Sequence, residues 1–194
     1  NKSLQGVIGT SFKALAYETS TKIDLLIQKE IKINRRFSKH PTIALFIKEH
    51  NKRWEQLSEE NKKKKLELNK ELWRGKGALF KELTQSPSAR QLEKFFLQDE
   101  SFIFSTLAFF LTDKNGILVA ALNENQPYIS LPNKNLKAIK DSFISDIYFD
   151  QIKNQYVFRI SIPVKNFQKN TIGYFQRIYS AKGFFSPFIE PITF

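Results

Sequence analysis

The chain has 194 residues, of which 41% are hydrophobic, so it suits one domain, with or without a helical annex. A chain of this length buries roughly 70% of its unfolded surface, which is enough for a core without covalent links. It contains no Cys, which excludes disulfides, thiolate metal sites and cysteine nucleophiles. Its net charge of +12 fits nucleic acid or an anionic membrane as partner, or lysines that are simply solvated.

The N-terminal region predicts one long helix. Apolar side chains recur at helical spacing across residues 3–37, no Pro interrupts them, and no Gly follows Gly9. Such a helix would be about 50 Å long, which is more than one small core requires. Because helices that outgrow their domain usually connect something at each end, this length indicates a connecting role. The stripe comprises Leu4, Val7, Ile8, Phe12, Leu15, Thr19, Ile23, Leu26, Ile27 and Ile31.

Three further helices are predicted in the first half of the chain. Pro41 ends the long helix, and residues 43–57 carry apolar side chains at helical spacing. Ser58 is typical of an N-cap and begins a third helix, which we expect to end near residues 74–77. Pro87 stands at the first position of a fourth helix, where Pro is well tolerated.

Beyond the fourth helix the pattern changes from helix to strand. The segments FIFSTLAFFLT and ILVAA predict two strands. The residues from Asp113 to Gly116 form the turn between them, and we expect the Asp113 side chain to cap it. A loop containing Tyr128 and a short helix at about residues 133–142 follow. The segments ISDIYFD, QYVFRISIPV and TIGYFQRIYS predict three more strands.

The order of these elements predicts an α+β fold, in which helices come first and about five antiparallel strands follow. We divide the chain into a long helix with a helical region at residues 1–98 and a sheet with a C-terminal tail at residues 99–194. We expect the two parts to form one structural unit, because no low-complexity linker separates them.

The stretch FFLTDKNGILVAALNENQPY, followed by ISDIYFDQIKNQYVFRISIPV and TIGYF, resembles single Cache sensor domains, which have a PAS-like sheet. The order and spacing of short motifs carry this resemblance, and no single motif is specific. The stretch HPTIALFIKEHNKRWEQLSEEN resembles the region after the long first helix of such sensors, so the resemblance covers residues 3–180. The matching positions are Asp113, Gly116, Ile117 to Ala120, Tyr128, Asp150, Pro163, Val164, Ile172 and Gly173.

The resemblance implies the extracytoplasmic sensing domain of a bacterial membrane-anchored receptor, in the periplasm or outside the cell. The output would be a histidine kinase, a chemoreceptor, or a cyclase or phosphatase regulator, and membrane helices would flank this segment. A small molecule would bind one face of the PAS-like sheet, beneath a lid formed by the Tyr128 loop and the short helix after it. The long N-terminal helix would relay the signal.

Two departures from the family bear on this expectation. Relatives often carry an aromatic pair on the short helix, where this chain has Leu136 and Ile139, so the lid is altered. The tail contains Gly183, Pro187 and Pro191, so it cannot continue as the outgoing helix of relatives. The tail either covers the sheet, forms a dimer contact or fills the pocket itself. Its aromatic residues are Phe184, Phe185, Phe188 and Phe194.

A sensor pocket needs a few polar groups among apolar walls. Arg159 lies in an otherwise apolar strand, so its charge must reach water or meet a partner, either a carboxylate ligand or Asp146. Asp146 and Tyr148 alternate along one strand and point together into the pocket or to solvent. Tyr128 offers a hydroxyl from the lid loop or packs in the core. The predicted ligand-binding residues are Tyr128, Asp146, Tyr148, Tyr156, Arg159 and Tyr179, of which Tyr156 and Tyr179 are the weakest candidates.

The sequence contains no recognisable catalytic motif. The two His residues, His40 and His50, show neither metal-ligand spacing nor an acid–base partner. No Gly-x-Ser-x-Gly elbow is present, and the glycines at positions 75 and 77 lack the third Gly of a dinucleotide-binding loop. We therefore predict a protein that is not an enzyme and has neither a cofactor nor a metal site.

Two other functional classes stay open. A structural or protein-interaction module would have no small-molecule pocket and would dock its partner on the helical half. A basic nucleic-acid binder would need an aromatic and basic sheet face, but the order of motifs argues against a nucleic-acid partner. The run from Lys62 to Lys65 is a solvated helix face or attracts anionic headgroups. The first helix suits a homodimer paired along its stripe. The strand aromatics are Tyr148, Phe149, Tyr156, Phe158 and Tyr174.

Overall fold

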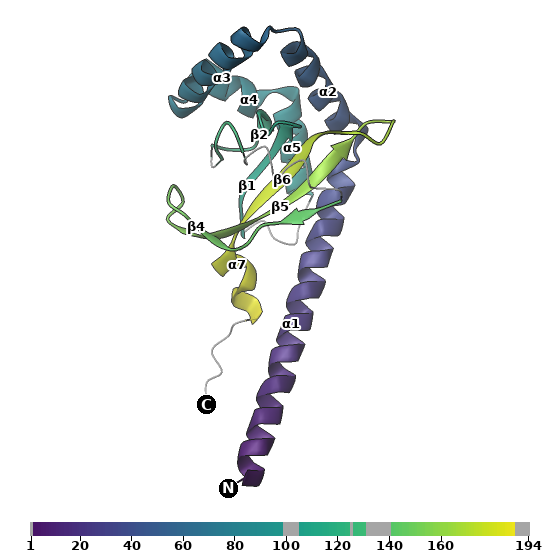
Figure 1. Ribbon diagram of the computed structural model, residues 1–194, viewed down its shortest axis with the longest axis vertical. Helices are drawn as coiled ribbons and strands as arrows, with labels where there is room; N and C mark the ends of the chain where they lie inside the picture. The colour runs from purple at the N-terminus through teal and green to yellow at the C-terminus, as the bar shows by residue number, and fades with distance from the viewer. Residues whose placement is uncertain (1, 99–104, 125, 131–140, 189–194) are drawn as a thin grey trace.

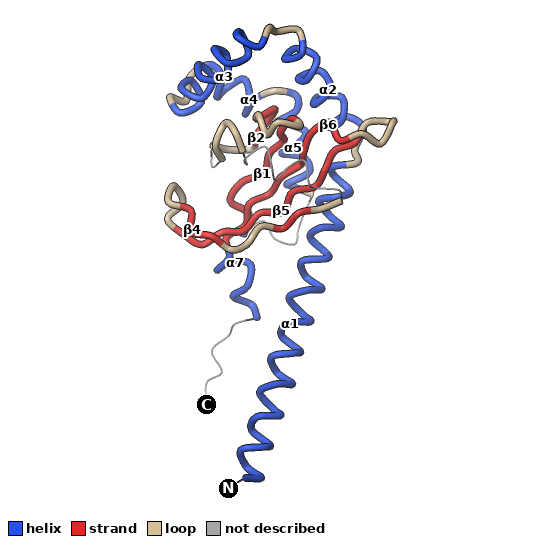
Figure 2. The backbone as a smooth tube through the Cα atoms, viewed as in Figure 1, coloured by secondary structure: helices blue, strands red, loops and turns tan. Residues whose placement is uncertain are grey.

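The computed structural model describes residues 2–98, 105–124, 126–130 and 141–188, with the side chains of residues 13–187 within those ranges. Helix α1 (Lys2–Ser38) runs beside a sheet and extends well beyond it, which makes the molecule elongated (Figure 1). The prediction of one long N-terminal helix is therefore confirmed. Figure 2 shows the strands gathered into one sheet, with most of the other helices at the opposite end from the part of α1 that extends beyond the sheet, and one short helix (Ala181–Phe185) on the same side as that part.

The helices follow the predicted order with one addition. Ser58 Oγ accepts a hydrogen bond from Asn61 N at 3.3 Å, and Ser86 Oγ accepts one from Ala89 N at 3.1 Å, so both act as N-caps. The sequence pattern missed the short helix between them, which begins directly after Gly77 and buries Leu83. After α1 the helices are α2 (Pro41–Glu55), α3 (Glu59–Arg74), α4 (Ala78–Gln85) and α5 (Pro87–Leu97).

The strands form one antiparallel sheet in the order β2-β1-β6-β5-β3, with β4 also paired to β5. The predicted α+β arrangement is therefore confirmed. The long strands β1, β6 and β5 lie at its centre, where Gln176 is paired with Phe110 on one side and Ser161 on the other. The strands are β1 (Thr106–Asp113), β2 (Leu118–Ala121), β3 (Phe143–Ile144), β4 (Tyr148–Asp150), β5 (Gln155–Lys165) and β6 (Thr171–Ser180).

The turn between β1 and β2 has the predicted chemistry. Asp113 Oδ1 accepts hydrogen bonds from Asn115 N at 2.8 Å and from Ile117 N at 2.9 Å. Gly116 has φ = 82°, a conformation that Gly adopts without steric cost. Asp113 therefore serves its own turn, as an Asx-type cap.

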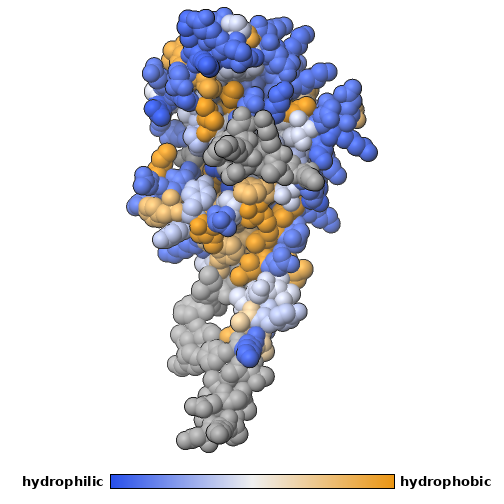
Figure 3. Space-filling model, viewed as in Figure 1, coloured by the Kyte–Doolittle hydropathy of each residue, from blue (hydrophilic) through white to orange (hydrophobic). Residues whose placement is uncertain are grey.

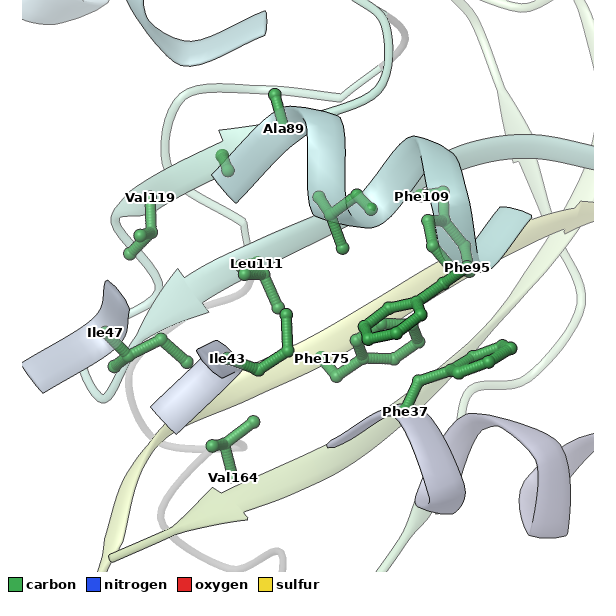
Figure 4. Close-up of a cluster of buried hydrophobic side chains, with 12 residues drawn as sticks. Phe37, Ile43, Ile47, Ala89, Phe95, Phe109, Leu111, Val119, Val164 and Phe175 are labelled. Atoms are coloured by element: carbon green, nitrogen blue, oxygen red, sulfur yellow. The ribbon is translucent and has the colours of Figure 1, made fainter. Parts of the chain in front are cut away.

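Helices α1, α2 and α5 cover one face of the sheet with a dense aromatic core (Figure 4). Phe37 of α1 stacks on Phe95 of α5 at 4.7 Å between ring centroids, and Phe109 meets Phe175 edge-to-face at 4.8 Å. Strand β6 lies close to α2 at Gly173. A Cβ atom at this position would be only 2.8 Å from Ile47 Cγ2. The buried members are Phe37, Ile43, Ile47, Ala89, Leu92, Phe95, Phe109, Leu111, Val119, Ala120, Val164 and Phe175.

A second cluster joins α3 and α4 to the β1–β2 side of the sheet. Trp54 and Trp73 are buried there with Leu83 and Tyr128. The Trp73 indole N–H donates to the carbonyl oxygen of Gln126 at 2.9 Å. This bond ties α3 to the loop that follows β2, so the helical region and the sheet share one core.

The C-terminal tail turns back against the sheet as a short helix, α7 (Ala181–Phe185), followed by a 3₁₀ helix (Ser186–Phe188). Phe184 packs against Phe158 and Tyr179, in a cluster that also contains Ile31 of α1. The tail through residue 187 therefore covers the face that carries α1. Residues 189–194 lie outside the described part of the chain, as does the side chain of Phe188.

Candidate ligand-binding site

The face of the sheet opposite α1 carries a buried polar cluster. Side chains alternate along a strand, so Arg159 and Ser161 of β5 point away from Phe158, which packs on the α1 side. Gln176 of β6 and Thr112 of β1 lie on the same face as Arg159 and are joined by a hydrogen bond of 2.9 Å. Arg159 is 7% exposed, and the other three polar side chains belong to fully buried residues.

Arg159 stands at the centre of this cluster. Its Nη1 donates to Ser130 Oγ at 2.8 Å and lies 3.4 Å from Gln176 Oε1. Its Nη2 lies 3.4 Å from the Tyr148 hydroxyl. Ser130 comes from the loop after β2, where its backbone N–H donates to Gly116 O at 2.9 Å. Three segments that are distant in sequence therefore meet around one guanidinium group.

The charge of Arg159 has no acidic partner in the described part of the chain. Its buried Nε atom has no hydrogen-bond partner there either. Asp146 is exposed and forms no ion pair with Arg159, so the alternative pairing expected from the sequence is not found. Residues 131–140, which follow Ser130, contain no Asp or Glu. A buried cation without a counterion costs several kcal/mol, so this arrangement favours an external anion.

The other predicted ligand-binding residues lie in different places. Tyr148 is 37% exposed at the rim of the cluster. Tyr128 is buried, and its hydroxyl accepts a hydrogen bond from Asn69 Nδ2 of α3 at 2.8 Å. Burial raises the Tyr128 pKa to about 12. Tyr128 therefore joins a helix to the sheet, and only its neighbour in the loop, Ser130, reaches Arg159.

Tyr156 and Tyr179 lie outside the polar cluster. Tyr156 is 61% exposed, with its ring against Phe149 at the edge of the sheet. Tyr179 is fully buried on the face that α1 covers, and its hydroxyl donates to Glu30 Oε2 at 2.8 Å. Neither side chain contacts Arg159, so we leave both out of the candidate site.

Four members of the cluster were not singled out by sequence reasoning. Thr112, Ser161 and Gln176 interrupt apolar strands in the same way as Arg159, which was the available signal, whereas Ser130 lies in a loop and gave no such signal. Their meeting depends on the register between strands, which sequence patterns do not fix. The predicted short helix at residues 133–142, with Leu136 and Ile139, lies mainly outside the described residues. The four members are Thr112, Ser130, Ser161 and Gln176.

Two surface clefts lie elsewhere, one beside the β1–β2 turn and one between α2, α4 and the start of α5. One of about 430 Å³ is lined mainly by α2, α3 and the turn, and includes Trp54 and Asp113. Another of about 190 Å³ includes His50 and Glu82. His50 Nε2 lies 3.9 Å from Asp113 Oδ2 in the wall between the clefts. Burial lowers the His50 pKa to about 4 and raises the Asp113 pKa to about 6, so it disfavours the charged form of each group.

The strand aromatics do not form a single exposed platform. Phe158 and Tyr174 are both buried, and they lie on opposite faces of the sheet. The stacking surface that a nucleic-acid binder would need is therefore not formed by these residues together.

Comparison with protein-family models and with curated proteins found no match to this chain. The described residues contain no group of three or more His, Cys, Asp or Glu side chains that could hold a metal ion. Among the described helices, none has a stretch that is both long and apolar enough to span a bilayer.

Proposed function

We propose that this chain is the extracytoplasmic ligand-sensing part of a membrane-anchored signalling receptor and that it binds a small carboxylate at Arg159. The observation that carries the proposal is a buried guanidinium with neutral hydrogen-bonding neighbours and no acidic partner in the described part of the chain. The resemblance to Cache sensors and the length of α1 support the same reading. The output would be a histidine kinase, a chemoreceptor, or a cyclase or phosphatase regulator.

The surroundings of Arg159 define the chemistry of the ligand. A guanidinium presents parallel N–H groups that match the two oxygens of a carboxylate. Ser130 and Tyr148 add hydroxyl groups beside it, which suit further oxygen atoms on the ligand. No Asp or Glu contacts the cluster within the described residues, so an ammonium group would find no counterion there. We therefore favour an organic acid over an amino acid or an amine, bound without chemical turnover.

Thermal melting with a panel of carboxylates, amino acids, amines and purines tests the proposal. A ligand at a hundred times its Kd adds about 2.7 kcal/mol, which corresponds to a rise of roughly 5–10 °C in Tm for a chain of this size. We expect the rise with a carboxylate and its loss in Arg159→Met. Arg35→Gln is the matched control, because it removes an Arg that pairs with Asp141 away from the cluster. A panel without any shift, or a shift retained in Arg159→Met, would contradict the proposal.

A protein-interaction module is the second candidate, and one surface favours it. Apolar side chains are exposed around β4 and its turn into β5, among them Ile152 at 83% exposure. Figure 3 shows hydrophobic residues on this side of the sheet, whereas the helical end with α2 and α3 is mostly hydrophilic. This candidate would be favoured if no ligand in the panel shifts the Tm and if the Ile152→Asp variant no longer binds a partner that the unchanged chain binds. The exposed apolar residues are Ile144, Ile147, Tyr148, Phe149, Ile152 and Tyr156.

Pairing of two chains along α1 stays a prediction. Leu15 belongs to the predicted stripe and is exposed on the part of α1 that extends from the sheet. Sedimentation of the chain with Leu15→Asp, compared with the unchanged chain, distinguishes a dimer held by this stripe from a monomer.

A further inference from the structure

A second buried polar network lies on the α1 side of the sheet. The Tyr179 hydroxyl donates to Glu30 Oε2 at 2.8 Å and accepts from Asn34 Nδ2 at 3.1 Å. Arg177 Nη1 lies 3.4 Å from the same Glu30 oxygen, and Arg177 Nε donates to Thr106 Oγ1 at 2.7 Å. The side chains of Glu30 and Arg177 are fully shielded from solvent.

This network fixes α1 on β6 in one register. Glu30 and Asn34 lie one turn apart on the same face of α1, and Arg177 and Tyr179 lie two residues apart on the same face of β6. The surrounding contacts, such as Ile31, are apolar and therefore tolerate sliding. The polar contacts are directional, so a movement of α1 along β6 would leave a buried charge without its partner.

Strand β6 carries the two networks on its two faces. Gln176 points to Arg159, and the next residue, Arg177, points to Glu30. Gln176 Oε1 receives contacts from Arg159, Ser130 and Ser161, all at 3.3–3.4 Å. Contacts of that length are weak and are easily exchanged for others. A change in the position of Arg159 therefore alters the weak side-chain contacts of Gln176, while its 2.9 Å bond to Thr112 and the pairing of β6 with both neighbouring strands stay in place. The altered contacts lie directly behind the residues that hold α1.

We propose that β6 couples the Arg159 site to α1, through Gln176 on one face and Arg177 with Tyr179 on the other. The inference rests on the proposed function, because it names the route by which occupancy of that site reaches the long helix. A bound anion draws the Arg159 guanidinium away from Gln176, and β6 settles in a different position. The Glu30 contacts then carry α1 with it, because the alternative is an unpaired buried charge.

A double-mutant cycle tests this coupling without any ligand. The variants are Arg159→Met, Tyr179→Phe and the pair together, with unfolding equilibrium constants measured in urea. Tyr179→Phe keeps the ring that stacks on Phe158 and removes only the hydroxyl held by Glu30 and Asn34. Independent sites combine within about twofold. We expect the two substitutions to be coupled by at least about fivefold, the lower end of typical coupling between sites.

Tyr156→Phe with Arg159→Met is the matched control cycle. Tyr156 lies three residues from Arg159 on the same strand, outside the Glu30 network, and it is exposed. We expect this cycle to be additive within about twofold. Additivity in the Tyr179 cycle would overturn the proposal. Equal coupling in both cycles would also overturn it, because the effect would then be a general response to changes near Arg159. Arg159→Lys replaces Arg159→Met if the latter does not unfold cooperatively.

Hydrogen exchange along α1 gives a readout that a merely structural role of Tyr179 does not produce. We expect Arg159→Met to change the protection of amides in residues 26–38, although it lies on the opposite face. The same change should be absent in a Tyr179→Phe background. Unchanged exchange in α1, or a response that persists without the Tyr179 hydroxyl, would refute the coupling. Because no ligand is used, these results are independent of whether the carboxylate panel produces a hit.

Discussion

The His50–Asp113 contact predicts two pH dependences of opposite sign. The nitrogen and the oxygen are 3.9 Å apart, and their side chains are 16% and 2% exposed. Burial is the largest influence on both groups, and Arg53 and Lys65 further disfavour a charged His50. The perturbations are Asp113→Asn, which keeps an oxygen for the turn, and His50→Gln, which removes the imidazole.

The magnitudes follow from the two pKa values. The His50 pKa is about 4 in the folded chain against 6.5 as its ordinary value, so the unfolded state takes up the proton first. The free energy of unfolding therefore falls by about 3 kcal/mol as the pH drops from 6.5 to 4. The Asp113 pKa is about 6 against 3.8. Its ionisation costs the folded state about 3 kcal/mol, which appears as the pH rises from 3.8 to 6.

In the unchanged chain these two effects largely cancel between pH 4 and pH 6. Each substitution removes one of the two effects, so that the other is no longer cancelled. Relative to the unchanged chain, Asp113→Asn should lose about 2 kcal/mol of unfolding free energy between pH 6 and pH 4, because the opposing Asp113 effect is removed and only the His50 effect remains. His50→Gln should gain a similar amount over the same interval. Urea unfolding at several pH values measures both, and all other carboxylates cancel in the differences.

The opposite result has a clear physical meaning. If His50 and Asp113 formed an ion pair, the His50 pKa would be raised and the Asp113 pKa lowered. Both differences would then change with pH in the reverse direction. Differences that do not vary with pH would show that neither group is as strongly desolvated as its burial indicates. Either outcome refutes the reasoning, whereas a constant offset from lost packing that is added to the expected pH dependence does not.

Two further predictions concern the fold. Gly173→Ala should destabilise the chain by about 3 kcal/mol or more, because the added Cβ would clash with the Thr112 carbonyl oxygen and with Ile47. Chemical unfolding measures the loss of unfolding free energy. The two N-caps should differ in their contribution to stability. Ser86→Ala should cost about 1–2 kcal/mol, because Ser86 is part-buried and has the shorter cap bond, whereas Ser58→Ala should cost about 0.5 kcal/mol, because Ser58 is exposed. Equal losses of unfolding free energy would contradict this ranking.

Features that depend on neighbouring residues were predictable from the sequence. The long helix, the cap at Ser58, the helix start at Pro87 and the Asp113 turn all depend on residues within a few positions of one another. Helix α4 was missed because it has only eight residues and lies between two helices, just after Gly77. Periodicity over so short a segment gives a weak signal.

Features that depend on strand register were only partly predictable. Arg159 was recognised because a charge in an apolar strand requires a partner. The sequence alone could not show that Tyr179 lies on the opposite face of the sheet from Arg159, because no local sequence pattern shows which face α1 covers. Tyr128 was expected either to offer its hydroxyl to a ligand or to pack in the core, and its hydroxyl meets Asn69, a residue 59 positions away. Such pairings become visible only once the helices are placed on the sheet.

The comparison of Arg159 with Arg177 explains why the two faces of the sheet have different roles. Both are buried arginines on neighbouring central strands, and they point to opposite faces. Arg177 has Glu30, and two aromatic rings lie against its guanidinium, so its charge is compensated within the fold. Arg159 has hydroxyl and amide neighbours, which orient a guanidinium but do not neutralise it. Among the described residues, Arg159 has no acidic partner of the kind that Glu30 provides for Arg177. This difference is why we propose an anionic ligand for this face of the sheet and not for the α1 face.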